Sequence, residues 1–82
     1  MKASLKQAKF IANNVPLSIQ DEMSLSEFNA MYARCQELES NQAHSIISLI
    51  KEADDCSWRG KKEDAAVKRD GALNLMKEYK IV

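Results

Sequence analysis

Residues 53–66, ADDCSWRGKKEDAA, hold the side chains of this 82-residue chain that are best suited to chemistry. They include paired acids, a cysteine, the only tryptophan, a glycine and a basic cluster. Four kinds of site could use such residues: a calcium loop, a phosphate-binding loop, a zinc site, or a surface that contacts another protein. The spacing of the residues decides among them.

A calcium loop lies between two helices and carries oxygen ligands at fixed positions. If Asp55 takes the first position of such a loop, Ser57 falls at the third and Gly60 at the sixth, where the sharp turn requires glycine. The match then ends. Arg59 occupies the fifth position, and Ala66 stands where a bidentate glutamate should close the coordination shell. We therefore expect no calcium site.

Phosphate and zinc sites fail on spacing as well. The RGKK stretch lacks the first glycine of a P-loop and the serine or threonine that binds magnesium. Zinc would need Cys35, His44 and Cys56 with a fourth ligand, yet successive members of this set are nine and twelve positions apart. Zinc sites normally contain a close ligand pair. We predict no metal and no cofactor.

Nucleophilic catalysis would pair Cys35 or Cys56 with His44 as the base. Cys35, however, falls on an apolar helical stripe, where cysteine acts as a small hydrophobic residue. A chain of this length buries only about 60–65 % of its unfolded surface, which leaves little room for a deep, water-excluding site. We therefore predict that the protein is not an enzyme.

Trp58 has two interpretations. Tryptophan is highly buried on average, so we expect its indole to cover the end of the core. The alternative is a partner contact, since tryptophan and arginine are enriched at interface hot spots. The candidate partner-binding residues are Trp58, Arg59, Lys61 and Lys62. The rival surface is acidic and consists of Glu37, Glu39, Asp54 and Asp55.

The elements that would position these residues are helical. The chain has two glycines and one proline, and no alternating pattern lasts long enough for a sheet. We predict an all-α single domain over residues 1–82, a small bundle of three to four helices. The expected helices cover residues near 3–13, 24–39, 41–54 and 61–79, with a connector over 16–23.

Ser24 and Glu27 give the clearest helix start, because a serine three residues before a glutamate matches a capping box. Whether the helix that begins there continues into 41–54 is open, since the apolar spacing runs across Ser40. An unbroken helix from Ser24 to Ala53 would be about 45 Å long, which is long for a compact domain. We favour a break or bend near Ser40.

Apolar spacing predicts which residues face the core. The first helix should direct Leu5, Ala8, Ile11 and Ala12 inward. The second should direct Leu25, Phe28, Met31, Tyr32, Cys35 and Leu38 inward, and the third Ala43, Ile46, Ile47, Ile50 and Ala53. In the last, Ala66, Leu73, Met76 and Lys80 lie along one line, with Ala65, Ala72 and Tyr79 beside it. Gly71 marks either a close helix contact or a break.

Net charge is zero but unevenly distributed. Residues 1–13 carry three lysines and no acid, residues 14–57 carry eight acids against two bases, and residues 58–82 carry seven bases against four acids. We explain this pattern by a central acidic helix that packs between basic ends. The alternative is a basic or acidic face that is presented to a charged partner.

The function that fits best is a protein-binding module: an adaptor, regulator or inhibitor that covers a surface of a larger protein. By association only, the starting methionine and short length suggest a complete small reading frame of the kind that phages and mobile elements carry. A homodimer would enlarge the core. The alternative is a nucleic-acid binder that presents Lys61, Lys62, Lys68 and Arg69, but three acids of the same helix, Glu63, Asp64 and Asp70, oppose it.

No run approaches the roughly 18–20 apolar residues of a membrane span. Lysines spread through the first fourteen residues, which therefore lack the apolar block of a signal peptide. We expect a cytoplasmic protein with no membrane contact and with both cysteines reduced.

Overall fold

Local capping signals start some of the helices of the computed structural model, which describes residues 1–82. Ser24 Oγ accepts from the Glu27 N–H and the Glu27 carboxylate accepts from the Ser24 N–H, so the predicted capping box is confirmed. Ser4 and Gln7 form the same reciprocal pair at the start of the first helix. Each serine has extended φ and ψ angles, as is usual for the residue just before a helix. The two capping boxes therefore set the residue at which each helix begins.

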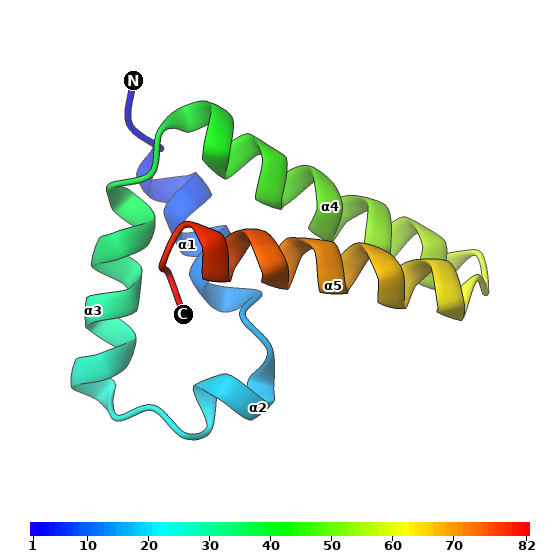
Figure 1. Ribbon diagram of the computed structural model, residues 1–82, viewed down its shortest axis with the longest axis horizontal. Helices are drawn as coiled ribbons and strands as arrows, with labels where there is room; N and C mark the ends of the chain where they lie inside the picture. Colours follow the sequence, from blue (N-terminus) through cyan, green and yellow to red (C-terminus); the bar gives the residue numbers. More distant parts are fainter.

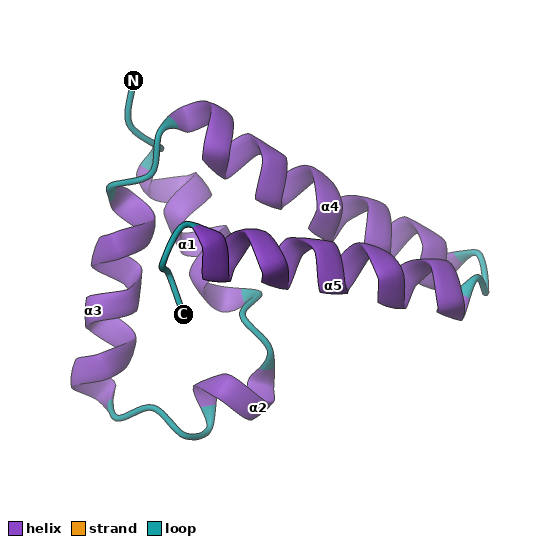
Figure 2. Cartoon of the chain, in the orientation of Figure 1, coloured by secondary structure: helices purple, strands orange, loops and turns teal.

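Five helices follow one another, and the structure contains no strand (Figure 2). They are α1 (Leu5–Asn13), α2 (Leu17–Gln20), α3 (Leu25–Gln36), α4 (Ser40–Trp58) and α5 (Lys62–Glu78). The all-α prediction is confirmed, and the helix count of three to four is too low. The additional element is α2, a single turn in the predicted connector that follows Pro16. Pro16 is the N-cap residue of α2, with φ −50° and a non-helical ψ of 136°.

The break near Ser40 is confirmed. Glu39 has extended backbone angles, φ −69° and ψ 150°, and separates α3 from α4. Gln42 Oε1 accepts from the Glu39 N–H at 3.0 Å, which helps to start α4 at this point. At its other end α4 continues to Trp58, four residues beyond the predicted end at residue 54.

The longest dimension of the molecule follows the α4–α5 hairpin (Figure 1). α4 and α5 run antiparallel, and α1 packs against both α3 and α4. The turn between α4 and α5 lies at the end of the hairpin farthest from α3 (Figure 1). None of the helices combines the length and the apolar character needed to cross a bilayer.

The core lies where α1, α3 and the near half of the hairpin meet. Its largest fully buried side chains are Ile11, Met31, Cys35, Ile46, Met76 and Ile81. Most predicted inward residues of α1, α3 and α4 are buried or half-buried. Gly71 lies within an unbroken α5, so it does not mark a break, and a Cβ there would make only an ordinary contact with Leu49 Cδ1, at 3.5 Å.

Some residues of the predicted inward lines face solvent instead. Leu5 is 67 % exposed and Leu25 is 77 % exposed, because each stands in the first turn of its helix, ahead of the first buried residue. Ala66 is also exposed. The buried residues of α5 are Ala65, Ala72 and Met76. Of the predicted line, Met76 is therefore buried and Leu73 is half-buried, while Lys80 lies beyond the end of the helix and is exposed.

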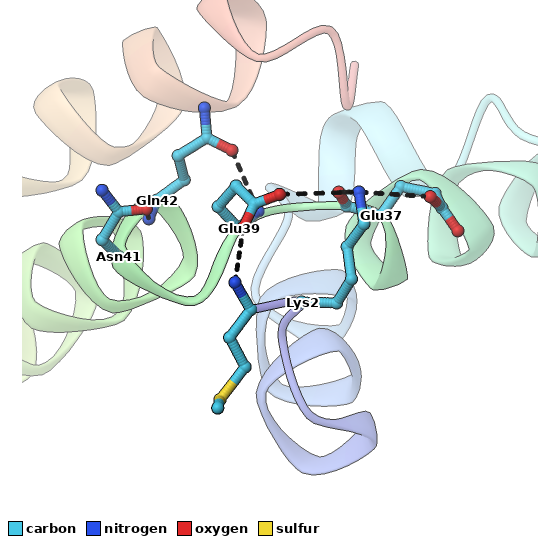
Figure 3. Close-up of polar contacts among 6 residues, drawn as sticks. Lys2, Glu37, Glu39, Asn41 and Gln42 are labelled. Carbon is cyan, nitrogen blue, oxygen red and sulfur yellow. Dashed lines mark hydrogen bonds and ion pairs between the residues drawn. The ribbon is translucent and has the colours of Figure 1, made fainter.

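Residues 1–4, the N-terminal strap, join the α3–α4 connection (Figure 3). The Ala3 N–H donates to the Leu38 carbonyl and the Ser40 N–H donates to the Met1 carbonyl, both at 2.8 Å. Lys2 Nζ donates to the Glu37 carbonyl at 3.0 Å and lies 3.6 Å from Glu39 Oε1. The strap therefore holds the connection that separates α3 from α4.

Candidate partner-binding surface at the hairpin tip

Residues 55–64, the hairpin tip, form a turn that is built from backbone hydrogen bonds. The Lys61 N–H donates to the Cys56 carbonyl at 2.8 Å, and the Gly60 N–H donates to the Ser57 carbonyl at 3.1 Å. These two bonds make a Schellman motif, in which the residue after the C-cap is left-handed. Gly60 has φ +79°, a value that glycine adopts without a steric penalty. The backbone at the tip is thus well defined.

Trp58, the last residue of α4, is 90 % exposed. The prediction that its indole covers the end of the core is wrong. The buried residues nearest the tip are Ala53 and Ala65, which lie outside the main hydrophobic cluster. Because small alanines bring the two helices together here, no large apolar surface remains for an indole to cover. Trp58 projects into solvent.

The charged residues of the tip are mixed rather than basic. Arg59 Nε lies 3.3 Å from Asp55 Oδ2, one turn earlier on α4. Lys61 and Lys62 are exposed, and the first turn of α5 brings Glu63 and Asp64 beside them. Acids are favourable at a helix N-terminus because they complement its dipole. The four predicted partner-binding residues therefore lie together, but acidic residues lie among the three cations.

The start of α5 contains an open hollow of about 450 Å³. It is lined by Gly60, Lys61, Lys62, Glu63 and Asp64, with no apolar residue. Small-molecule sites are lined mainly by hydrophobic and aromatic side chains. The tip thus fits a broad contact with a macromolecule better than a pocket for a small ligand.

The rival acidic surface is divided. Glu37 and Glu39 lie at the α3–α4 connection, while Asp54 and Asp55 lie near the far end of α4. Fifteen residues of helix between Glu39 and Asp54 correspond to about 22 Å. All four carboxylates also have a cation within 4.0 Å inside the molecule. The structure does not bring these four residues together.

The basic residues proposed for a nucleic-acid contact are also partly paired. Lys68 Nζ lies 3.7 Å from Glu52 Oε2, and Arg69 Nη2 lies 4.0 Å from Asp54 Oδ1. Both pairs join α5 to α4. Because each cation already has a carboxylate beside it, α5 does not present a continuous basic face to phosphate groups.

Burial separates Cys35 from the His44 imidazole, while Cys56, the other candidate thiol, is half-buried and lies twelve residues from His44 on α4. Cys35 has no exposed surface, as expected of a small hydrophobic residue, and burial raises the pKa of its thiol to about 11 despite the nearby Arg34. His44 is exposed on α4, where its Nε2 lies 3.3 Å from Ser48 Oγ. The structure contains no group of three or more His, Cys, Asp or Glu side chains that could hold a metal ion.

Sequence reasoning did not identify a second surface feature, the hollow between α1 and α4. Its volume is about 240 Å³. It includes Lys6, His44 and Lys51, with Lys51 Nζ 5.9 Å from the centre of the Phe10 ring. A usable signal was the excess of lysines over acids in residues 1–13, although nothing in the spacing places these lysines against residues 44–51.

Comparison with known proteins identified no relative of this chain. No protein-family model, no curated protein and no solved structure matches the chain.

Proposed function

We propose that this chain is a non-enzymatic protein-binding module that contacts a larger protein through the hairpin tip. Trp58 is the anchor of the contact, and Arg59, Lys61 and Lys62 form part of a charged rim. The observation that carries the proposal is the exposure of Trp58, the largest side chain in the molecule, at the end of a well-defined hairpin.

Burial of an exposed indole would contribute strongly to binding. A tryptophan buries roughly 150–250 Å², and apolar burial is worth about 25 cal/mol/Å², so the gain is about 4–6 kcal/mol before the costs of association. The cost of ordering is small, because an aromatic side chain has only two rotatable bonds. An aromatic anchor within a polar rim is the usual arrangement of an interface hot spot.

The mixed charges at the tip favour a specific partner over a merely acidic one. In this rim, basic residues alternate with Asp55, Glu63 and Asp64. Such a pattern sets the orientation in which a complementary partner binds more than it raises the rate of association. The burial of Cys35 supports the non-enzymatic part of the proposal, since a thiol with a pKa of about 11 is not a thiolate at neutral pH.

The experiment begins with affinity capture from the native host and identification of the captured protein by mass spectrometry. The purified partner is then titrated by calorimetry against the wild-type chain and against Trp58→Ala. We expect Trp58→Ala to weaken binding at least about 30-fold, since a hot spot contributes about 2 kcal/mol or more.

The matched control is Leu25→Ala, which removes another exposed apolar side chain, at the start of α3. This variant should bind as the wild type does, and circular dichroism should show both variants to be as helical as the wild type. Wild-type affinity for Trp58→Ala, or equal losses in the two variants, would refute the hairpin tip as the contact.

A further inference from the structure

The hollow between α1 and α4, here called the α1–α4 groove, differs in charge from the other surface hollows. It contains Lys6, His44 and Lys51 but no acid. Each of the other three hollows has at least one carboxylate in its lining. Neither Lys6 nor Lys51 forms an ion pair, although six ion pairs occur elsewhere. The groove therefore presents uncompensated positive charge.

The groove also has an apolar base. Phe10 and Ile47 are half-buried and line it, and Lys51 Nζ lies 5.9 Å from the centre of the Phe10 ring. A cation above an aromatic face is attracted to it, which favours a Lys51 position close to the groove. A ligand here would meet both hydrophobic surface and positive charge.

The groove and Trp58 lie along one side of α4. His44, Lys51 and Trp58 are spaced by seven residues, and seven residues fall about 20° short of two full helical turns. The three side chains therefore leave the helix in nearly the same direction. Fourteen residues at 1.5 Å per residue place Trp58 about 21 Å from His44 along the axis.

Between the groove and Trp58 the side of α4 is electrically balanced. Asp55 pairs with Arg59 at 3.3 Å, and Asp54 lies 4.0 Å from Arg69. One side of α4 thus offers a positive groove, then a neutral stretch, and finally an exposed indole.

We propose that this side of α4 binds an acidic amphipathic helix of the partner protein. About 14 residues of helix span the 21 Å. Acidic side chains at one end of that helix face Lys6, His44 and Lys51, and an apolar side chain at the other end packs on Trp58. The inference rests on the proposed function and adds to it the kind of segment that is recognised.

The test uses synthetic 14-residue peptides without tryptophan or tyrosine. One carries leucines at helical spacing with glutamates at one end, and the second has lysines in place of the glutamates. Trp58 is the only tryptophan of the chain, so its fluorescence reports binding directly. We expect the glutamate peptide to bind and to shift Trp58 emission to shorter wavelengths, with at least tenfold weaker binding of the lysine peptide.

Charge reversal in the groove makes the test specific. Lys6→Glu with Lys51→Glu should weaken the glutamate peptide at least tenfold and improve the lysine peptide. The matched control, Lys77→Glu with Lys80→Glu, makes the same change in net charge on residues outside the groove and should leave both affinities close to wild type. Circular dichroism checks that each variant remains helical.

Several results would overturn the inference: no binding of the glutamate peptide at millimolar concentration, equal affinity for the two peptides, or equal effects of the two double variants. Duplex DNA that competes as well as the glutamate peptide would also overturn it, since the groove would then be a general polyanion contact. If Lys6→Glu with Lys51→Glu leaves binding of the captured partner unchanged while Trp58→Ala abolishes it, the groove fails and the proposed function stands.

Discussion

Ile81 is fully buried although it follows the end of α5. Its N–H donates to the Met76 carbonyl at 2.8 Å, while Lys80 takes a left-handed φ of +61° and turns the chain back toward the core. Arg34 donates through Nε and Nη2 to the Ile81 carbonyl, at 3.2 and 2.8 Å. A single residue outside any helix therefore joins α5 to α3.

The first prediction concerns this residue. Ile81→Ala should lower the free energy of unfolding by about 2–4 kcal/mol, because it removes fully buried methyl groups and leaves a cavity. Val82→Ala is the control, since Val82 is only partly buried and should cost less. Urea denaturation of both variants measures the difference, and equal small losses would show that Ile81 does not close the core.

At the scale of single residues, the burial of Ile81 and the exposure of Trp58 could not be predicted from the sequence. Residue preferences place a tryptophan inside, but burial depends on whether a large apolar surface lies within reach, and Ala53 and Ala65 leave none at the tip. The apolar pattern of the last helix did not predict the burial of Ile81, because that burial depends on the left-handed backbone turn at Lys80, beyond the helix. The burial of Cys35, which lies in the last turn of α3, was predicted correctly from spacing alone.

At the scale of elements, local signals predicted the helices well and long-range contacts poorly. The Ser24–Glu27 capping box and the break near Ser40 depend on residues that are close in sequence, so the pattern contained them. The N-terminal strap depends on hydrogen bonds between residues more than thirty positions apart, such as Ala3 to Leu38. No periodicity within one segment encodes such a pairing.

The second prediction concerns this strap. The α-amino group of Met1 donates to Glu39 Oε2 at 2.9 Å and, with Lys2, holds the pKa of the Glu39 carboxyl below its usual value. A group with a lowered folded-state pKa contributes stability above its unfolded pKa, and that contribution is lost as pH falls through the folded value. The loss should therefore occur below about pH 4.5, the ordinary value for glutamate.

Glu39→Gln should remove this part of the acid dependence, so that its unfolding free energy falls less than that of the wild type between pH 7 and pH 3. Urea denaturation at the two pH values makes the comparison. Glu37→Gln is the matched control, because Glu37 lies 3.5 Å from Lys2 but has no contact with the α-amino group. An identical fall in Glu39→Gln and wild type would contradict the role of the strap carboxylate.

At the scale of the whole molecule, the ion pairs agree with the explanation of the uneven charge. Lys2 pairs with Glu37 and Glu39, and two basic residues of α5, Lys68 and Arg69, pair with acids of α4. The basic ends of the chain thus pack against its acidic middle, although exposed pairs of this kind contribute little to stability. Lys6 and Lys51 of the α1–α4 groove form no such pair, whereas the tip combines the Arg59–Asp55 pair with an exposed Trp58. These two surfaces, at opposite ends of one side of α4, are the ones that we propose for a partner.

The central claim is that Trp58 serves binding and not folding, and ¹⁹F NMR of the chain labelled with 5-fluorotryptophan tests it most directly. The single tryptophan gives one resonance. In the free protein, replacing H₂O with D₂O should shift that resonance by as much as it shifts the resonance of free, fully hydrated 5-fluorotryptophan. A saturating amount of the captured partner should move the resonance and reduce the solvent shift. A small solvent shift in the free protein, or an unchanged resonance in the complex, would contradict the account.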